Sequence, residues 1–550
     1  MKDFIWFKNY AEGVPQEIDP GRYKSVLELF EESVEKFNQA PAFENMGKSI
    51  TFQELDQLSE QFAAFLQTKA NLKKGDRVAI QMPNLLQYPV AMFGALRAGC
   101  VVVNTNPLYT SREMKHQLTD SGASAIVILA NFAHNLEKII ADTSIKTVIV
   151  TEIGDLLGGL KGTIVNLAVK YIKKMVPSYK IAGAIKFNQT LGYNLSYSRP
   201  SVGSGEVAFL QYTGGTTGVS KGAMLTHRNV ISNMEQICAW MAGDLKDAEE
   251  TVITALPLYH IFALVVNCLT MLKLGANNVL ITNPRDMPAF IKEMAKHDFS
   301  VLTGVNTLFN ALLNQSAFRE LDFSALKMSI GGGMAVQKSV ALEWKEATGV
   351  TLTEGYGLTE ASPVLTCNPI GSEKLGSIGL PVPSTEVGIF DEEGNPLGMG
   401  EVGELYARGP QVMAGYWQRP TETEKTMQGD WLKTGDMAVA SDDGFFAIVD
   451  RKKDMILVSG FNVYPNEVED VVASHAKVLE VAAVGIPDQK STEAVKLFIV
   501  KKDQSLTEEE IRAFCRENLT GYKCPKEVEF RTELPKTNVG KILRRKLKEA

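Results

Sequence analysis

The sequence predicts a multidomain α/β protein: a large N-terminal domain of layered α/β subdomains with a small β-barrel-like unit, and a small mobile α+β C-terminal domain. Over residues 25–150, helical patterns such as SVLELFEESVEKF alternate with short apolar strands such as RVAIQM and AIVIL. This alternation is typical of helices layered on mostly parallel strands. From about residue 376 the pattern changes to strands with glycine-rich turns, and beyond residue 455 to a compact α+β pattern.

The length of the chain supports several domains. At 550 residues, the chain exceeds what a single hydrophobic core usually holds. We predict an N-terminal domain over 1–449, with its β-rich unit at about 376–449, and a C-terminal domain over 455–550. The charge run DRKKD at 450–454 marks the junction between them.

A loop rich in glycine and threonine is the first candidate site. The segment YTGGTTGVSKGAML, residues 212–225, follows a short apolar strand, EVAFLQ, and precedes a helical pattern that Thr226 is placed to cap. Glycines bring the backbone N–H groups within reach of a ligand, so the loop is a donor-rich cradle for an anion such as phosphate. It is not a P-loop, because its lysine precedes the glycine. A flexible surface loop is the alternative. The candidate residues are Tyr212, Thr213, Gly214, Gly215, Thr216, Thr217, Gly218, Ser220 and Lys221.

Composition narrows the function classes. The net charge of −7 argues against nucleic acid as the main partner. The six cysteines include no Cys-x-x-Cys pair, so their spacing predicts neither a zinc site nor a disulfide framework and fits a reducing compartment. The N-terminal stretch MKDFIWFKNYAEGVPQE lacks a continuous apolar run, so we expect no signal peptide.

Residues 251–272 form an uncharged apolar segment, TVITALPLYHIFALVVNCLTML. Pro257, His260 and Asn267 lie within it and argue against a membrane-spanning helix. We expect a buried strand, a turn at Pro257 and a core helix in a soluble protein.

A basic amphipathic helix is predicted over 161–176. Its apolar stripe lies opposite Asn166, Lys170, Lys173 and Lys174, which is typical of a helix at a membrane surface. A surface helix packed on the core remains an equal alternative. The stripe consists of Ile164, Leu167, Ala168, Tyr171, Ile172, Met175 and Val176.

Six segments, taken in order, resemble the adenylate-forming superfamily of acyl-CoA synthetases, adenylation domains and luciferases over essentially the whole chain. Other segments, including NTNPLYTSREMKHQL, GVNTLFNALLN and GPQVMAGYWQRP, are similar to bacterial long-chain fatty-acid–CoA ligases in particular, as is VKYIKKMVPSY. The six are YTGGTTGVSKGAMLTHRN, LPLYHIFAL, EGYGLTE, DWLKTGD, DRKKDMILVSGFNVYP and LPKTNVGKILRRKL.

The resemblance implies a two-step reaction. ATP would activate a long-chain fatty acid to acyl-AMP with release of pyrophosphate, and CoA would then displace AMP, feeding β-oxidation and lipid synthesis. Alternatives are a synthetase for a medium-chain or aromatic acid, an assembly-line adenylation domain, and a non-catalytic fatty-acid-binding or transport module.

The same resemblance implies roles for single residues. The β- and γ-phosphates of ATP would occupy the loop at 212–221, and Glu360 would hold Mg²⁺, which prefers hard oxygen ligands. Lys541 would act on the fatty carboxylate and α-phosphate during AMP transfer. Thr213, Glu360, His260 and Lys541 are the predicted catalytic residues.

Further residues would hold the nucleotide. Tyr356 would stack on adenine, Gly332 and Gly333 would leave room for its ring, and Asp436 and Arg451 would reach the ribose. Gly357, Thr359, Lys453 and Gly460 complete the predicted cofactor-binding set. Lys453 also falls where the family has the hinge of its C-terminal domain, so 450–454 is the predicted hinge.

The expected partners are ATP, CoA, a long-chain fatty acid and an anionic membrane surface, with no nucleic acid. The expected location is the cytoplasm, in peripheral contact with the inner face of the cytoplasmic membrane. A homodimer remains open, because the sequence does not determine oligomeric state.

Overall fold

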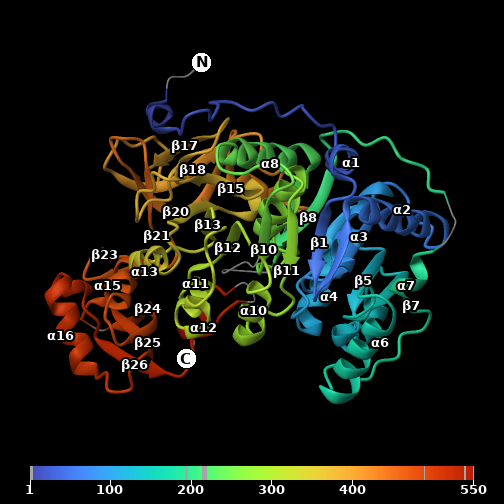
Figure 1. Ribbon diagram of the computed structural model, residues 1–550. Coiled ribbons are helices and arrows are strands. Elements are labelled where there is room, and N and C mark those ends of the chain that lie inside the picture. The colour runs from blue at the N-terminus through green and yellow to red at the C-terminus, as the bar shows by residue number, and fades with distance from the viewer. Residues whose placement is uncertain (1–3, 193–195, 214–219, 489, 538–539, 549–550) are drawn as a thin grey trace.

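The computed structural model describes residues 4–192, 196–213, 220–488, 490–537 and 540–548. Figure 1 shows a large body of sheets and helices, coloured blue to orange, with the C-terminal unit in red at one side of it. This arrangement confirms the predicted α/β fold class with a small α+β unit at the C-terminal end.

A nine-stranded sheet forms the centre of the large body. Its inner strands, from β14 to β1, are parallel, while β2, β15 and β16 run antiparallel to their neighbours. Short runs of apolar and β-branched residues form these strands because both faces are covered by helices. The order is β16 (Leu380–Pro381), β15 (Val364–Cys367), β14 (Leu352–Gly357), β13 (Met328–Gly332), β12 (Val301–Gly304), β10 (Thr251–Thr254), β11 (Asn277–Leu280), β1 (Pro41–Asn45) and β2 (Lys48–Thr51).

A seven-stranded sheet lies beside it and is parallel except for β9. The loop at 214–219 joins β8 to β9, and Thr213 pairs with Lys221 across that antiparallel edge. The order is β7 (Ile185–Lys186), β6 (Thr147–Thr151), β5 (Ala125–Leu129), β3 (Arg77–Gln81), β4 (Val101–Asn104), β8 (Val207–Thr213) and β9 (Lys221–Thr226).

Three helices of the large body begin at a threonine cap. Thr51, Thr110 and Thr226 each accept a hydrogen bond from the backbone N–H three residues on, as N-cap residues do. The helices are α1 (Val26–Phe37), α2 (Phe52–Thr68), α3 (Gln87–Arg97), α4 (Ser111–Ser121), α5 (Ala133–Glu137), α6 (Gly159–Leu167), α7 (Phe187–Thr190), α8 (His227–Met241), α9 (Met271–Lys273), α10 (Met287–Met294), α11 (Asn306–Leu313), α12 (Ser316–Arg319), α13 (Lys338–Thr348) and α14 (Pro420–Thr426). Short 3-10 helices are η1 (Ile5–Asn9), η2 (Ala130–Phe132), η3 (Ile140–Asp142) and η6 (Thr359–Ala361), and π-helices are η4 (Ala168–Ile172) and η5 (Ala263–Thr270).

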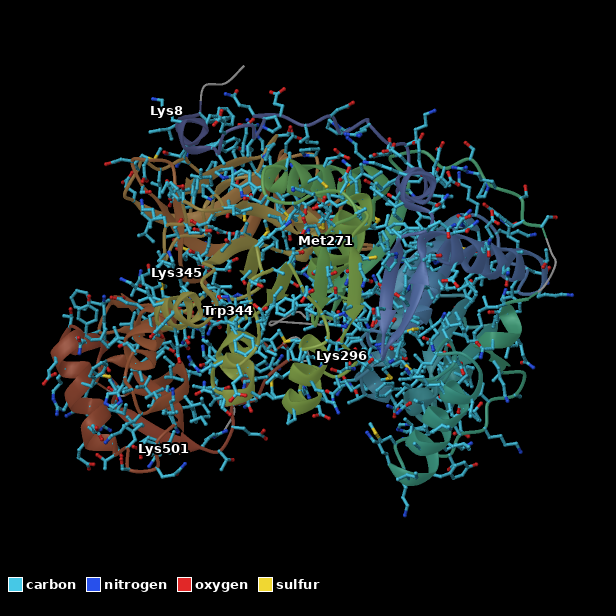
Figure 2. The ribbon with its side chains drawn as sticks, viewed as in Figure 1. Lys8, Met271, Lys296, Trp344, Lys345 and Lys501 are labelled. Carbon is cyan, nitrogen blue, oxygen red and sulfur yellow. The ribbon has the colours of Figure 1, made fainter. Side chains whose placement is uncertain are left out.

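Apolar side chains from both sheets fill the interior. Met271 and Trp344 are fully buried, whereas lysines such as Lys8 and Lys345 extend from the surface (Figure 2). The apolar segment 251–272 forms β10, a turn in which the His260 N–H donates to the Pro257 carbonyl, and the buried η5, as predicted. Within the described part of the chain, no helix has the length and apolar character needed to cross a membrane.

The β-rich unit predicted from about residue 376 is a five-stranded antiparallel sheet. It consists of β17 (Glu386–Phe390), β18 (Val402–Arg408), β19 (Met427–Gln428), β20 (Trp431–Ala440) and β21 (Phe446–Arg451). In the pairing of β20 with β21, Asp436 lies directly opposite Arg451. The sheet therefore brings two predicted nucleotide-binding residues together.

The C-terminal unit has hydrophobic clusters of its own and touches the large body through polar contacts. The Thr307 hydroxyl donates to the Gly540 carbonyl and the Asn310 amide to the Leu479 carbonyl, each at 2.9 Å. The predicted domain bounds and hinge remain predictions. The elements are β22 (Ile456–Val458), β23 (Phe461–Val463), α15 (Pro465–Ala473), β24 (Val478–Asp488), β25 (Thr492–Lys501), α16 (Glu508–Asn518), η7 (Gly521–Lys523), β26 (Glu527–Arg531) and α17 (Arg544–Lys548).

The basic segment near residue 165 projects from the seven-stranded side of the molecule as α6, which continues into η4 (Figure 1). Most of its predicted apolar stripe is exposed rather than packed on the core, with Ile172 reaching 81% exposure. Only Val176 packs partly against the neighbouring core. The geometry therefore favours the interfacial interpretation over a helix packed on the core.

Candidate functional site

A cavity of about 1650 Å³ lies where the nine-stranded sheet, the edge of the seven-stranded sheet, the β-rich unit and the C-terminal unit meet. It lies at the carboxyl ends of β13 and β14, the usual position of ligands in open α/β sheets. Most predicted site residues with described positions line it: Tyr212, Thr213, Lys221, His260, Gly332, Gly333, Tyr356, Gly357, Thr359, Glu360, Asp436, Arg451, Lys453 and Lys541.

Some predicted residues are not among the lining set. Gly214, Gly215, Thr216, Thr217 and Gly218 lie outside the described residues. Gly460 has φ +85° in the turn between β22 and β23 and does not line the cavity. The structure therefore does not bring Gly460 to the other site residues.

Gly332 and Gly333 give the cavity a flat wall at the end of β13. A Cβ on Gly332 would lie 3.1 Å from the Gly355 carbonyl oxygen, and one on Gly333 would lie 3.2 Å from Cε of Lys541. Gly333 also has φ +78°, which side-chain-bearing residues rarely adopt. Both positions leave little room for a side chain, and the backbone conformation of Gly333 also favours glycine.

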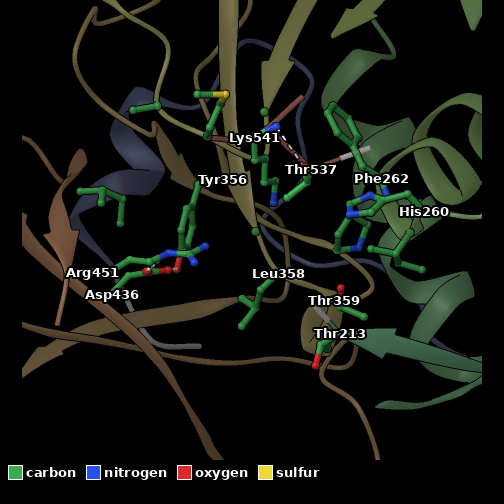
Figure 3. Close-up of a pocket in the computed structure, with 18 of the residues that line it drawn as sticks. Thr213, His260, Phe262, Tyr356, Leu358, Thr359, Asp436, Arg451, Thr537 and Lys541 are labelled. Atoms are coloured by element: carbon green, nitrogen blue, oxygen red, sulfur yellow. Dashed lines mark hydrogen bonds and ion pairs between the residues drawn. The ribbon is translucent and has the colours of Figure 1, made fainter. Parts of the chain in front are cut away.

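Tyr356, Asp436 and Arg451 form a hydrogen-bonded group on one side of the cavity (Figure 3). The Tyr356 hydroxyl donates to Oδ2 of Asp436 at 2.6 Å, and Nε of Arg451 lies 3.5 Å from Oδ1. Burial, followed by the Asp436 charge, raises the pKa of Tyr356 well above its usual range, so the phenol stays a donor. Asp436 retains acceptor capacity toward a ligand.

Glu360 is a half-buried carboxylate in η6 whose position is fixed by Tyr416. The Tyr416 hydroxyl donates to its Oε1 at 2.6 Å, and the Met413 N–H donates to its backbone carbonyl. Burial raises the pKa of Glu360, while the bond from Tyr416 and the charge of Lys221 lower it. Tyr416 lies in the segment GPQVMAGYWQRP, yet nothing in the sequence pairs it with Glu360.

Lys221 and Thr213 stand at the two ends of the glycine–threonine loop. The Lys221 ammonium forms an ion pair with Glu422 and lies 5.1 Å from the centre of the Tyr416 ring. The Ser220 hydroxyl donates to the Thr213 carbonyl, which holds the loop ends together. Thr213 and Lys221, the described residues on either side of 214–219, therefore both line the cavity.

Tyr212 is mostly buried at the end of β8, and its hydroxyl donates to Oδ2 of Asp120 at 2.8 Å. Burial, followed by this bond to the carboxylate, raises the pKa of the phenol far above its usual range. The hydroxyl is thus committed to a protein partner.

Lys541 enters the cavity from the C-terminal unit (Figure 3). Its N–H donates to Oγ1 of Thr537 at 3.1 Å, and the Thr537 N–H donates back to the Lys541 carbonyl, forming a tight turn. Burial, followed by repulsion from Arg451, lowers the pKa of Lys541 to about 8, although Asp436 and Glu360 favour the charged form. A cation of this kind can stabilise charge that develops on a phosphate.

His260 also lines the cavity, beside Phe262 (Figure 3). Burial, followed by repulsion from Lys541, lowers the pKa of His260 to about 3, so its imidazole is neutral near pH 7. A neutral imidazole has one donor and one acceptor nitrogen. It can therefore orient a carboxylate without forming an ion pair.

One end of the cavity is apolar, which sequence reasoning did not reveal. Trp240 contributes to this end, and its indole N–H donates to the Asn368 carbonyl at 3.0 Å, which fixes the ring. An apolar chamber of this kind suits a hydrocarbon chain. Its walls include Ile237, Trp240, Met241, Cys367, Ile378 and Val382.

Lys453 lies in a turn in which the Asp454 N–H donates to the Arg451 carbonyl at 2.9 Å. Burial, followed by repulsion from Arg451, lowers the pKa of Lys453 to about 8. Behind it, Arg544 pairs with Asp450, Asp454 and Glu469. Sequence reasoning predicted this junction but not the role of Arg544 in holding it.

Comparison with known families and proteins yields one consistent result. Residues 30–417 match the family described as AMP-binding enzyme, and residues 467–541 match the AMP-binding enzyme C-terminal domain. A long-chain-fatty-acid–CoA ligase of Salmonella typhimurium is 59% identical over 548 residues, covering 99% of this chain and 98% of that protein. One of Bacillus subtilis is 38% identical, covering 99% and 97%.

Solved structures of CoA ligases and related enzymes share the fold of this chain over nearly its whole length. An anthranilate CoA ligase in complex with anthranoyl-AMP aligns with a TM-score of 0.87 at 25% identity, covering 97% of this chain and 98% of that one. ATP-bound MatB from Rhodopseudomonas palustris aligns with a TM-score of 0.80 at 26% identity, covering 96% and 98%.

Proposed function

Because the chain belongs to the AMP-binding enzyme family, we propose that it is an AMP-forming long-chain fatty-acid–CoA ligase. The fatty carboxylate attacks the α-phosphorus of ATP, and the bond to pyrophosphate breaks. The CoA sulfur then attacks the acyl carbon, and AMP leaves. The identity of 59% with a ligase of this name over nearly the whole length supports a long-chain fatty acid and CoA as the substrates.

The placement of Lys541 carries the proposal. The half-buried Lys541 side chain lies against Gly333, in the same cavity as Glu360, Asp436 and the ends of the glycine–threonine loop. During AMP transfer, negative charge gathers on the oxygens of the reacting phosphate and the leaving pyrophosphate, and fixed donors and cations stabilise it. Lys541 would supply a positive charge of this kind between the fatty carboxylate and the α-phosphate.

The remaining polar groups would hold the nucleotide. Asp436, fixed by Tyr356 and Arg451, would accept hydrogen bonds from the ribose hydroxyls. The wall formed by Gly332 and Gly333 leaves space for a flat adenine ring, and Tyr356 would pack against it. Thr213, Lys221 and the loop that they anchor would hold the β- and γ-phosphates.

Glu360 fits a magnesium ligand. It offers a hard carboxylate oxygen at the cavity wall, and Tyr416 fixes the other end of the group without neutralising it. Magnesium bound there would offset the charge of the ATP phosphates. Thr359, beside Glu360 in η6, also lines the cavity.

The apolar end of the cavity would hold the acyl chain. Trp240 lines it, and His260, close enough to Lys541 for that charge to lower its pKa, would orient the carboxylate. With the hydrocarbon part of the fatty acid in this chamber, only the carboxylate would face the nucleotide. This division of the cavity supports a long hydrocarbon substrate over a purely polar one.

Incubation with ATP, CoA and oleate tests the proposal. We expect stoichiometric AMP, pyrophosphate and oleoyl-CoA.

A panel of fatty acids from short to very long, run on the wild type and on Trp240→Ala, tests the chamber. Removing the indole should move the optimum toward longer or bulkier acids. Binding of oleate with no AMP formed would instead support a non-catalytic fatty-acid-binding or transport module, and preferred turnover of an aromatic or medium-chain acid would change the assigned substrate.

We further propose that the exposed face of α6 and η4 docks on anionic phospholipid at the inner face of the cytoplasmic membrane. Leu160 and Ile172 are 77% and 81% exposed, and Lys170, Lys173 and Lys174 are exposed beside them. Apolar side chains would enter the interface while each lysine near an anionic surface contributes about 1 kcal/mol. Homodimer formation remains a separate prediction, testable by light scattering.

Flotation with vesicles of phosphatidylglycerol and phosphatidylethanolamine tests the docking. Changing Lys170, Lys173 and Lys174 to Glu should release the protein, with activity on detergent-dispersed oleate little changed. Changing Lys8, Lys138 and Lys345 to Glu, which are exposed elsewhere, provides a control of equal charge. Equal loss of binding in both variants would show non-specific attraction and would contradict docking by this face.

A further inference from the structure

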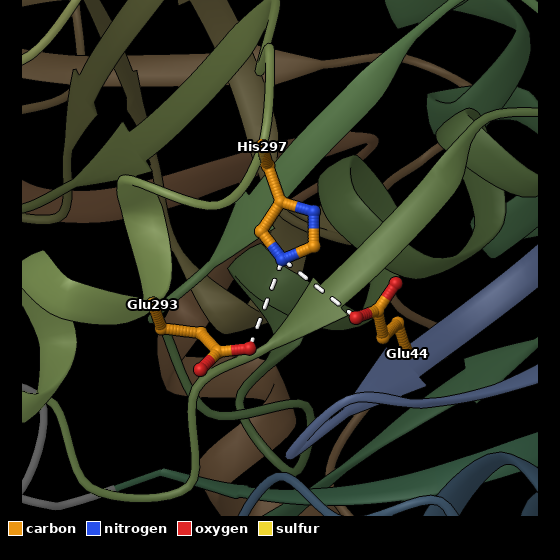
Figure 4. Close-up of side chains that lie close together, drawn as sticks. All are labelled: Glu44, Glu293 and His297. Atoms are coloured by element: carbon orange, nitrogen blue, oxygen red, sulfur yellow. Dashed lines mark ion pairs between the residues drawn. The ribbon is translucent and has the colours of Figure 1, made fainter.

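Glu44, Glu293 and His297 lie close together outside the catalytic cavity (Figure 4). Glu44 is in β1, Glu293 is in the last turn of α10, and His297 lies three residues beyond the end of that helix. Their nearest ligand atoms all lie within 4.8 Å of one another. The group therefore joins the first strand of the chain to a helix that covers the nine-stranded sheet.

Two of the three facing atoms lack a hydrogen-bond partner among the described residues. Nε2 of His297 lies 3.7 Å from Oε1 of Glu44 and 3.7 Å from Oε1 of Glu293. These separations are too long for hydrogen bonds. Nε2 of His297 and Oε1 of Glu293 are shielded from solvent and have no hydrogen-bond partner among the described residues. Unsatisfied buried polar atoms are costly, so their convergence on one point calls for an occupant.

Geometry and charge fit a divalent cation of the zinc type. In a tetrahedron, ligands at bond lengths of about 2.0–2.1 Å are roughly 3.4 Å apart. The two 3.7 Å separations from Nε2 of His297 would close by a few tenths of an ångström, and the two carboxylate oxygens, within 4.8 Å of each other, would close by up to about 1.4 Å. Lys296 pairs with the other oxygen of Glu293, which leaves Oε1 for the metal. The side chains are 13–18% exposed, so an ion and a water ligand can enter.

We propose that Glu44, Glu293 and His297 bind one Zn²⁺ ion that ties β1 to α10. One imidazole nitrogen and two carboxylate oxygens are a donor set that zinc accepts, with water in the fourth position. Mg²⁺ demands six oxygen ligands in near-octahedral geometry and does not match this set. The site is independent of the proposed ligase reaction, because none of its residues lines the cavity.

Zinc binding by the chelator-treated, dialysed full chain tests the site. The wild type should bind one equivalent of Zn²⁺ that Glu44→Gln and His297→Ala lack or bind at least about tenfold more weakly, and Zn²⁺ should raise its melting temperature but not theirs. Co²⁺ should give the visible absorption of a tetrahedral complex in the wild type only.

His475→Ala is the matched control, since His475 also lies 3.7 Å from a carboxylate oxygen, that of Glu510. This variant should keep the full zinc equivalent. Glu44→Gln keeps the shape of the side chain, so it gives a result even where His297→Ala fails to fold. Equal zinc uptake by the wild type and both site variants, or no uptake by the wild type, would overturn the proposal and leave an ion-pair cluster only.

Discussion

The hydroxyl of Tyr416 donates a 2.6 Å hydrogen bond to Oε1 of Glu360. The two residues are 56 positions apart in the sequence, and the bond holds a half-buried carboxylate at the cavity wall. Because this bond lowers the pKa of Glu360 against the effect of burial, it favours the charged form that a metal ligand needs. Tyr416 therefore acts as a positioning residue for the proposed Mg²⁺ site.

Tyr416→Phe should weaken the apparent Mg²⁺ affinity in acyl-adenylate formation about 10–100-fold, as loss of a residue that orients a metal ligand commonly does. Pyrophosphate release measured against Mg²⁺ concentration checks this, with high Mg²⁺ restoring much of the rate. Tyr406→Phe, in β18 away from the cavity, is the control and should leave the curve unchanged. An unaltered Mg²⁺ dependence in Tyr416→Phe would exclude the positioning role.

The pKa of Lys541, lowered to about 8, predicts a pH dependence. The protonated form neutralises phosphate charge, and it predominates below pH 8. The value of kcat/KM for acyl-adenylate formation should therefore fall as pH rises through about 8, since this parameter reports the free enzyme.

Variants at Arg451 and Lys453 test whether Lys541 is the group that titrates near pH 8. Arg451→Gln removes a charge that lowers the pKa of Lys541, so the alkaline limb should move to higher pH even though the overall rate drops. Lys453→Met removes the other lysine whose pKa is lowered to about 8 and should leave the limb in place. An alkaline limb that moves in Lys453→Met and stays in place in Arg451→Gln would identify Lys453, not Lys541, as the titrating group.

The contacts between Thr307 and Gly540 and between Asn310 and Leu479 hold the C-terminal unit with Lys541 in the cavity. Each bond contributes about 0.5–1.5 kcal/mol. Thr307→Val combined with Asn310→Ala should therefore slow acyl-adenylate formation roughly 5–100-fold. Thioester formation from supplied acyl-AMP should change little, if that step uses another orientation of the C-terminal unit.

Single-turnover measurements of both half-reactions check this prediction. Asn314→Ala is the control, because Asn314 caps the end of α11 and its side chain donates to Asn310 rather than to the C-terminal unit. Equal slowing of both steps would argue for one fixed arrangement of the two units throughout the reaction.

Much of the fold could be predicted because its signals are local. Short apolar runs predicted the parallel strands, and Thr226 predicted the start of α8, since burial on both faces and N-capping leave direct marks in a sequence. The strand order could not be predicted in this way. The pairing of β1 with β11 joins residues more than two hundred positions apart, and no local pattern encodes that choice.

The candidate site divides in the same manner. Glu360, Asp436 and Lys541 lie in motifs whose residue types and order resemble a known family, so they could be named from the sequence. Tyr416 and Trp240 could not, because their importance depends on which distant side chain or chamber they meet. Glu44 and His297 meet only through the pairing of β1 with β11 and the placement of α10.

The central claim is that Lys541 serves AMP transfer from its position in the cavity. Comparing the two half-reactions in Lys541→Ala tests it most directly. Acyl-adenylate formation from ATP and oleate should fall by two to four orders of magnitude, which corresponds to about 3–5 kcal/mol of lost charge stabilisation. Thioester formation from supplied oleoyl-AMP and CoA should persist at an appreciable rate. Equal loss in both half-reactions, or acyl-adenylate formation at the wild-type rate, would contradict the account.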